Sequence, residues 1–172
     1  MPFVLFHERF PDLAERETRT LTITNDAKLP AGSYALLEMY CDEPGCDCRR
    51  VFFSVLSSQT SQIEAVIAYG WESTRFYAQW MGNDDPKMAC ALKGPILNPG
   101  SRQAAFAPAL LDVVEHVVLQ DEPYVARLKT HYAMFRAAIN SERKTRQSHR
   151  QHKSQRRRLT NAQKRQRRRQ RS

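Results

Sequence analysis

Residues 33–58 read SYALLEMYCDEPGCDCRRVFFSVLSS, and this stretch decides the fold. Its first part, Ser33–Cys41, is apolar on both faces of an extended chain, which predicts a central β-strand. Its last part, Arg49–Ser58, predicts a second strand, because its apolar side chains alternate onto one face. Pro44 and Gly45 predict a tight turn between the two strands. The stretch is therefore predicted to form a β-hairpin whose loop carries three cysteines.

Two more strands are predicted, one before and one after this hairpin. Residues 18–25, TRTLTITN, alternate and are rich in Thr and Ile, and residues 62–71, QIEAVIAYGW, continue the set. Four strands in sequence with short connections predict a four-stranded antiparallel meander. Residues 1–17 mix apolar and charged side chains, which predicts a short helix or an arm.

After Trp71 the apolar period changes from 2 to about 3.6, which predicts helices. Ser73 is predicted to cap a first short helix, and residues 84–86, DDP, to begin a second. Residues 105–120 carry apolar side chains at helical spacing, and a long helix is predicted from Asp121 onward. The buried stripe of this long helix is predicted to consist of Val125, Leu128, Tyr132, Phe135 and Ile139. The fold class is therefore α+β: a meander followed by several packed helices.

The charge of the chain is distributed very unevenly. Residues 141–172 contain fourteen Lys and Arg but one acid, a net charge of +13, whereas residues 1–140 carry a net charge of −4. The basic segment has almost no apolar residue beyond Leu159 and Ala162, so it cannot bury enough surface to fold alone. Two parts are predicted: an α+β domain over residues 1–140 and an Arg-rich tail over residues 141–172, disordered or extending the last helix.

Such a tail predicts strong, salt-sensitive and sequence-independent binding of nucleic acid, because each neutralised phosphate releases counterions. Arg outnumbers Lys, which suits phosphate contacts and stacking on bases and so favours RNA, with the ribosome as one setting. A solubilising tail is the alternative, while the shortage of apolar anchors disfavours a membrane surface. The predicted contact residues are Arg156, Arg157, Arg158, Lys164, Arg165, Arg167, Arg168, Arg169 and Arg171.

Three of the four cysteines, Cys41, Cys46 and Cys48, lie within eight positions. Zinc prefers thiolates in a tetrahedron, and a hairpin loop supplies three ligands that are already close together. Cys46 and Cys48 are two apart, so an extended backbone directs both sulfur atoms to the same side. Cys90 is the predicted fourth ligand. Other possibilities for that position are a water molecule and the histidines of the body, namely His7, His116 and His131.

Other interpretations of the cysteines stay open. Arg49 and Arg50 are expected to lower the pKa of the nearby thiols, which would suit a redox switch or a thiol-dependent enzyme with Glu72 or Asp84 close by. Three free thiols in an ordinary turn are the plainest interpretation. Cys90 is equally compatible with a small core residue.

Aromatic residues gather where the last strand meets the first helix. Trp71, Tyr77 and Trp80 either cover the sheet or anchor a protein partner. Asp84 and Asp85 are more simply explained as helix caps than as catalytic acids. The chain has no Gly-rich phosphate loop, no serine elbow, no HExxH motif and no paired CxxC motif, so a non-enzymatic role is predicted.

The chain is predicted to be cytoplasmic. Its apolar runs are far shorter than the ~18–20 residues of a membrane span. Its first residues, MPFVLFHERF, have no basic segment and too short an apolar run for a signal peptide. In the cytoplasm, clustered cysteines more often bind metal or undergo redox chemistry than form structural disulfides.

The run LPAGSYALLEMYCDEPGCDCRRVFFSV, followed by YGWESTRFYAQWMG and DEPYVARLKTHYAMF, resembles a family of uncharacterised bacterial proteins. The resemblance covers roughly residues 5–137, and the cysteine turn and the YGWES segment occur in the same order. It implies a bacterial, cytoplasmic protein and brings no activity, substrate or catalytic residue. The Arg-rich tail lies outside the resembling region.

Overall fold

The computed structural model describes residues 3–82 and 85–169. From residue 146 onward, the only side chains it describes are those of Ser148 and Lys153. The chain divides into two compact units, Met1–Arg136 and Ala137–Ser172. The sequence placed the end of the folded domain at residue 140.

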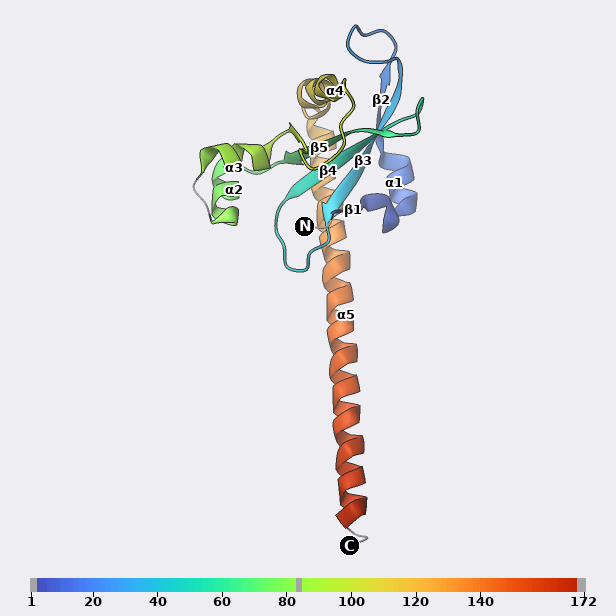
Figure 1. Cartoon of the computed structure of the whole chain (residues 1–172), viewed down its shortest axis with the longest axis vertical. Helices are drawn as coiled ribbons and strands as arrows, with labels where there is room; N and C mark the ends of the chain where they lie inside the picture. The colour runs from blue at the N-terminus through green and yellow to red at the C-terminus, as the bar shows by residue number, and fades with distance from the viewer. Residues whose placement is uncertain (1–2, 83–84, 170–172) are drawn as a thin grey trace. The chain divides into compact units, whose positions relative to one another are not determined.

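The first unit is built on an antiparallel sheet (Figure 1). Its four long strands pair in sequence order and are β2 (Arg19–Ile23), β3 (Gly32–Cys41), β4 (Arg50–Ser57) and β5 (Ile63–Gly70). This arrangement confirms the predicted meander and the predicted hairpin of β3 and β4.

Two short strands make the sheet larger than predicted. β1 (Phe3–Leu5) pairs with the end of β3, and β6 (Ile96–Leu97) pairs with β5. Within the part of the chain that the structure describes, the sheet therefore has six strands, and the prediction of four was too few. The reason is length: strands of three and two residues are too short for an alternating pattern to be recognised.

β1 and β2 share one edge of β3. β1 pairs with Met39–Cys41, and β2 pairs with Gly32–Leu36. The chain between them forms the 3₁₀ helix η1 (Phe6–Glu8) and the helix α1 (Pro11–Glu17). The segment predicted to be a short helix or an arm is therefore a strand followed by helical turns.

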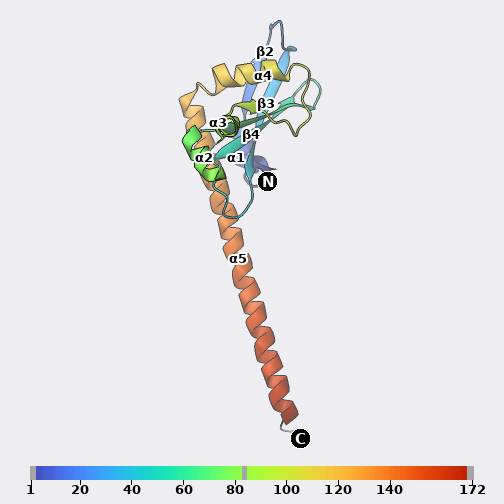
Figure 2. The ribbon, with the colours of Figure 1, turned by 60° about the vertical axis from the view of Figure 1, so that its left-hand side comes forward.

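One face of the sheet carries the main core, which α4 (Ala107–Val113), the π-helical segment η2 (Val114–Val118) and the start of α5 (Glu122–Arg169) complete (Figures 1 and 2). Aromatic contacts connect the two layers: the ring of Tyr40 lies 5.6 Å from that of Phe135, and Phe53 stacks on Tyr124. The fully buried residues of this core include Leu36, Tyr40, Val51, Phe53, Val55, Ile67, Leu110, Val114, Tyr124, Leu128 and Phe135.

The predicted stripe of α5 is correct at its centre and incomplete at its start. Leu128, Tyr132 and Phe135 are buried, whereas Val125 is only half-buried and Tyr124 is fully buried. Tyr124 lies four residues before Leu128 and so shares its face of the helix.

A smaller apolar cluster lies on the opposite face of the sheet. Phe52, Val66 and Ala68 are buried there, with Phe3 and Met39 packed against them. The ring centroids of Phe3 and Phe52 are 4.0 Å apart. The short strand β1 therefore contributes to the packing of this second face, beside the end of β3.

Two short helices, α2 (Thr74–Met81) and α3 (Pro86–Lys93), follow β5. Their predicted caps are confirmed: the Ser73 hydroxyl accepts a hydrogen bond from the Phe76 amide at 3.2 Å, and the Asp85 carboxylate accepts one from the Lys87 amide at 2.9 Å. Asp84, the other predicted cap, lies outside the described residues.

In the second unit the backbone of α5 stays helical as far as Arg169. Arg, Gln and Lys, which dominate this segment, are good helix formers, so the helix-extending alternative for the tail matches the described backbone. None of the helices in the described ranges combines the length and the hydropathy that a membrane span requires.

Candidate metal centre

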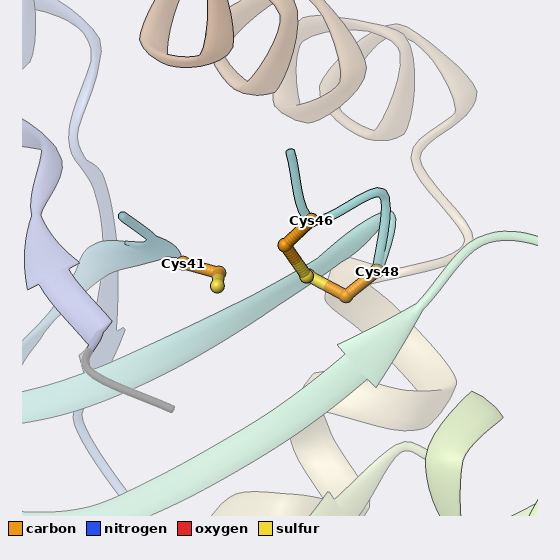
Figure 3. A group of neighbouring side chains, drawn as sticks. All are labelled: Cys41, Cys46 and Cys48. Atoms are coloured by element: carbon orange, nitrogen blue, oxygen red, sulfur yellow. The ribbon is translucent and has the colours of Figure 1, made fainter. Parts of the chain in front are cut away.

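The three clustered cysteines come together at one end of the central hairpin. Cys41 is the last residue of β3, while Cys46 and Cys48 lie in the loop of residues 42–49. The three sulfur atoms all lie within 4.8 Å of one another. In Figure 3 the side chains of Cys46 and Cys48 point toward each other, and that of Cys41 faces them from the strand end. The predicted convergence of three thiols is confirmed.

The turn that brings these thiols together follows from Pro44 and Gly45. The Cys46 amide donates a hydrogen bond to the Glu43 carbonyl at 3.2 Å, which closes a four-residue turn. Gly45 has a φ of 84°, a conformation that glycine adopts without steric cost. Proline followed by glycine in this conformation is typical of a type II turn.

Two side chains of α5 hold the loop in place. The Arg136 guanidinium donates hydrogen bonds to the carbonyl oxygens of Cys41 and Glu43, each at 3.0 Å. The Tyr132 hydroxyl accepts a hydrogen bond from the Arg49 amide and donates one to the Asp47 carboxylate, both at 3.3 Å. Both ends of the loop are therefore attached to a helix distant in sequence.

Arg49 closes the loop in a strained conformation. Its φ is 47°, in the left-handed region, which costs a non-glycine residue on the order of 1 kcal/mol. Several contacts hold it there. The Tyr77 hydroxyl donates to the Arg49 carbonyl at 2.9 Å, and the Arg49 guanidinium pairs with Asp47 at 2.9 Å and Glu72 at 3.1 Å. The backbone beside Cys48 is therefore fixed by its surroundings.

The thiols differ in exposure. Cys41 and Cys48 are 0% and 1% exposed, whereas Cys46 is half-buried. Solvent and ions therefore reach the cluster from the side of Cys46.

The thiols also differ in acidity. A hydrogen bond from the Cys48 thiol, the largest influence, lowers the pKa of Cys41 to about 6. The same hydrogen bond, together with burial, raises the pKa of Cys48 far above its usual value, and burial raises the pKa of Cys46. Near neutral pH the metal-free cluster therefore contains one thiolate, at Cys41, and two thiols that donate to it.

Of the two arginines that were expected to lower the pKa of the thiols, Arg49 instead forms ion pairs with Asp47 and Glu72. Among the weaker influences on Cys41 is the positive charge of Arg136, which lowers its pKa. The sequence did not indicate Arg136, because it lies 95 residues from Cys41 and only the packing of α5 brings it to the loop.

The other predicted metal ligands lie apart from the cluster. Cys90 is exposed on α3, and His7 and His116 are exposed as well. In the described ranges, no other His, Cys, Asp or Glu joins the three cysteines within 4.8 Å. The protein ligand set that the structure brings together is therefore three thiols without Cys90.

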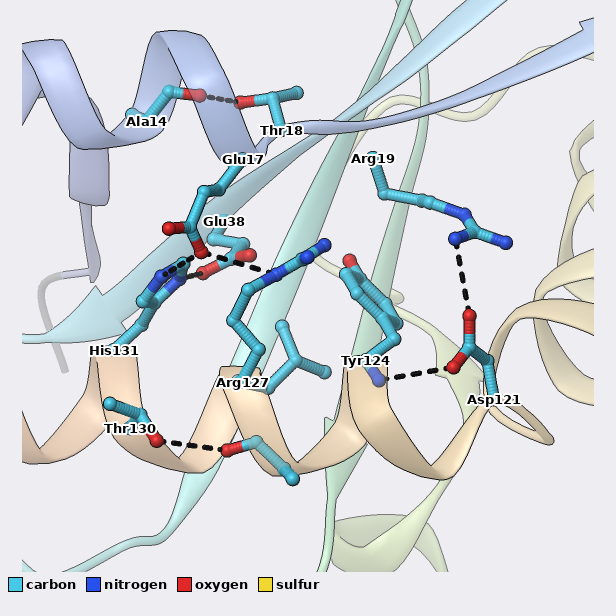
Figure 4. Close-up of polar contacts among 12 residues, drawn as sticks. Ala14, Glu17, Thr18, Arg19, Glu38, Asp121, Tyr124, Arg127, Thr130 and His131 are labelled. Carbon is cyan, nitrogen blue, oxygen red and sulfur yellow. Dashed lines mark hydrogen bonds and ion pairs between the residues drawn. The ribbon is translucent and has the colours of Figure 1, made fainter.

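His131 is buried, but it belongs to a polar cluster of its own (Figure 4). Its Nδ1 lies 2.8 Å from the Glu38 carboxylate and its Nε2 lies 3.2 Å from that of Glu17. The Tyr40 hydroxyl donates to Glu38 at 2.7 Å, and Arg127 lies 3.4 Å from Glu17. These contacts connect α1, β3 and α5, so His131 has a structural role in this arrangement.

The aromatic residues predicted as a partner surface separate into two groups. Tyr77 is fully buried and uses its hydroxyl to hold Arg49, so it cannot anchor a partner at the surface. Trp71 and Trp80 are half-buried, and the ring of Trp71 packs edge-on against Tyr132 at 5.2 Å. The interpretation that these aromatics cover the sheet therefore applies to Tyr77, and Trp71 supports the helix that holds the loop.

The predicted nucleic-acid contacts are not visible at the level of side chains. Arg156–Arg158 and residues 164–169 belong to α5, whose backbone is described, but their side chains and the whole of Arg171 lie outside the described residues.

Comparison of the chain with known protein families, with curated proteins and with solved structures found no match in any of the three. The fold and the site together define the class: an α+β domain with a rigidly held cluster of three cysteines that could hold a metal ion.

Proposed function

We propose that the first unit is a non-enzymatic metal-binding domain in which Cys41, Cys46 and Cys48 hold a zinc ion. The observation that carries this proposal is the approach of the three sulfur atoms to within 4.8 Å of one another. Thiolates favour zinc, copper(I) and iron–sulfur clusters, and iron–sulfur clusters take four cysteines. Zinc also accepts three protein ligands with a water molecule in the fourth position.

The surroundings of the cluster support a brace for the hairpin more than a catalyst. Two of the three thiols are buried, and the loop backbone is held from α2 and α5 by Tyr77, Tyr132 and Arg136. Glu72, which a thiol-dependent enzyme was expected to use, forms an ion pair with Arg49. A bound ion would join the end of β3 to the loop before β4.

The basic tail carries the second half of the proposal: it binds nucleic acid, with RNA or ribosomes as the partner, in a bacterial cytoplasm. The support is the net charge of +13 over residues 141–172, most of it from arginine. The bacterial setting rests on the resemblance of the cysteine turn and the YGWES segment.

Metal analysis of the purified full chain under reducing conditions tests the first half. We expect one zinc per chain, retained through gel filtration and lost in Cys41→Ser, Cys46→Ser and Cys48→Ser. Cys90→Ser is the matched control, because Cys90 lies outside the cluster, and it should retain the metal. A full-length chain that holds no stoichiometric metal contradicts the proposal.

RNA affinity measured against salt concentration tests the second half. In the full chain, replacing Arg156, Arg157 and Arg158 by Gln should reduce the salt slope by about 2, because each single-strand phosphate contact contributes about 0.7. The control, Arg16→Gln, changes an exposed arginine of α1 and should leave the slope unchanged. An unchanged slope in the triple variant excludes a role for these arginines.

A thiol redox switch is the second candidate function, favoured by the low pKa of Cys41, about 6. A thiolate is the reactive form of cysteine, so the metal-free protein should be alkylated at Cys41 within minutes near neutral pH once the reagent reaches it. Zinc-bound cysteines are protected from alkylation. The exposed Cys90 reacts in either case, so the labelled residue is identified by mass spectrometry. Rapid labelling of Cys41 in the protein as isolated would favour the switch over the metal brace.

A further inference from the structure

The cluster offers an ion three thiolates and, within the described residues, no fourth ligand from a His, Cys, Asp or Glu side chain. Zinc in structural sites is almost always four-coordinate, so zinc here needs a ligand from outside the chain. A soft monovalent cation, copper(I), also selects thiolates, and it is satisfied by three of them. The number of ligands therefore distinguishes between the two ions.

The charges around the cluster distinguish between them as well. Arg50 begins β4, two residues after Cys48, and its Nε is buried without a hydrogen-bond partner. Its guanidinium lies 5.2 Å from the Phe52 ring centre, and burial lowers its pKa. Within the part of the chain that the structure describes, no carboxylate forms an ion pair with Arg50. Its charge is therefore free to act on the neighbouring thiolates.

Arg136 provides the second positive charge. Its hydrogen bonds go to the carbonyl oxygens of Cys41 and Glu43, and no ion pair with a carboxylate is found for it among the described residues. Arg49, by contrast, forms ion pairs with both Asp47 and Glu72. Among the described residues, Arg50 and Arg136 are therefore two guanidinium groups beside the thiols that form no ion pair with a carboxylate.

The net charge of the loaded site depends on the ion. Zinc bound to three thiolates leaves one negative charge, whereas copper(I) bound to three thiolates leaves two. The copper complex therefore gains more than the zinc complex from the positive charges of Arg50 and Arg136. Charges in a poorly solvated site interact strongly, so these two cations favour the ion that leaves more negative charge.

We propose that Cys41, Cys46 and Cys48 form a three-coordinate site for copper(I), in which Arg50 and Arg136 offset part of the charge of the copper–thiolate complex. This rests on one part of the proposed function, that the three thiols bind a metal ion, and adds that they prefer copper(I) to zinc when both ions are offered. The thiol protons leave as the ion binds, and copper stays in the +1 state, so no electron is transferred. The half-buried Cys46 is the point of entry.

The test uses the full chain under anaerobic conditions. Copper(I) is titrated against bicinchoninate and zinc against a chromophoric zinc chelator, so that the affinity of each ion is measured separately. X-ray absorption on the copper-loaded protein gives the ligands. We expect one copper per chain with three sulfur ligands and no nitrogen or oxygen ligand, and a zinc form with three sulfur ligands and one oxygen ligand.

Variants of Arg50 test the charge match. Arg50→Gln should weaken copper(I) binding about tenfold more than it weakens zinc binding, because the copper complex carries one more negative charge. Arg50→Lys keeps the charge and should restore most of the copper affinity. Arg136→Gln should show the same preference as Arg50→Gln, and the exposed Arg16→Gln should change neither ion. Circular dichroism checks that each variant is folded.

The outcomes separate this inference from the proposed function. If neither ion binds, the metal-binding function itself is wrong. If zinc binds but copper is held by two sulfur atoms, or with a nitrogen or oxygen ligand, the three-coordinate copper site is wrong and the metal-binding function stands. If Arg50→Gln weakens both ions equally, the role of the arginines is overturned.

Discussion

The cysteine loop of residues 42–49 and the basic tail of residues 141–172 are the two chemically distinctive regions, and they are built in opposite ways. In the loop, each important group is positioned by residues distant in sequence, such as Tyr132 and Arg136. The tail is a charged segment whose described backbone is a continuation of α5, and its predicted activity depends on total charge.

This contrast teaches how each region should respond to mutation. A site held by a few long-range contacts loses its function in one step when a central group is removed. A region that acts through summed charge loses its function in small, nearly equal steps, because each arginine contributes a similar share of counterion release.

The largest effect is expected for Cys48→Ser. Serine keeps the size of the side chain but removes a thiolate ligand, and losing even a partner of a ligand costs 10–100-fold in affinity. We therefore expect metal affinity to fall by at least about 100-fold, measured by competition with a chelator. Cys90→Ser should have no effect. Equal losses in the two variants would show that Cys90 also takes part in binding the metal, and no loss in Cys48→Ser would show that metal binds outside the cluster.

The pH dependence of metal binding should be nearly as large. Cys41, with a pKa of about 6, is ionised near neutral pH, whereas Cys46 and Cys48, whose pKa values are raised, hold their protons. Binding to three thiolates then releases about two protons, so affinity should rise about 100-fold per pH unit between roughly pH 7 and 8 and fall as pH falls.

Calorimetry in buffers of different ionisation enthalpy counts these protons directly. A count near two supports three thiolate ligands that start as one thiolate and two thiols. A count near zero at neutral pH would mean that the thiols of the cluster are not the ligands.

Gly70→Ala is expected to break the support of the loop without touching a cysteine. A Cβ at Gly70 would clash with the Tyr77 hydroxyl, the group that donates to the Arg49 carbonyl. Overpacking of this kind costs about 1–3 kcal/mol, so the melting temperature should fall by several degrees and metal affinity should fall with it.

The control for this prediction is Gly100→Ala, whose Cβ would meet its nearest neighbours only at 3.9 Å or more. It should change stability by less than about 0.5 kcal/mol. If Gly70→Ala lowers stability but leaves metal affinity unchanged, the ligand geometry does not depend on Tyr77.

The parts of the fold that the sequence predicted correctly depend on local patterns. A run that is apolar on both faces predicted β3, alternation predicted β4, the Pro44-Gly45 pair predicted the turn, and Ser73 predicted a helix cap. Each of these patterns lies in, or within a few residues of, the strand, turn or helix that it predicted. The short strands β1 and β6 could not be predicted in this way, because three and two residues are too few to show a pattern.

The same limit applies to the candidate site. The spacing of the cysteines predicted their convergence, but not that Cys90 would lie apart on α3. Arg136 and Tyr132 reach the loop only through the packing of α5. No sequence pattern predicts that an arginine or tyrosine on a helix will contact a distant loop. The sequence left Tyr77 as either a cover for the sheet or a surface anchor, because burial is set by tertiary packing, and the structure buries it.

The smallest effect is expected for a single substitution in the tail, Arg167→Gln. If one phosphate contact is lost, RNA affinity should fall about fourfold at physiological salt, and the salt slope should fall by about 0.7. Arg158→Gln should have an effect of the same size, and the double variant should show the product of the two, because the contacts act independently. Metal content and melting temperature should stay constant throughout. A single substitution that abolished RNA binding would instead mean that the tail acts through a few specifically positioned residues, as the loop does. The contrast between a positioned site and a region that acts through summed charge would then be wrong.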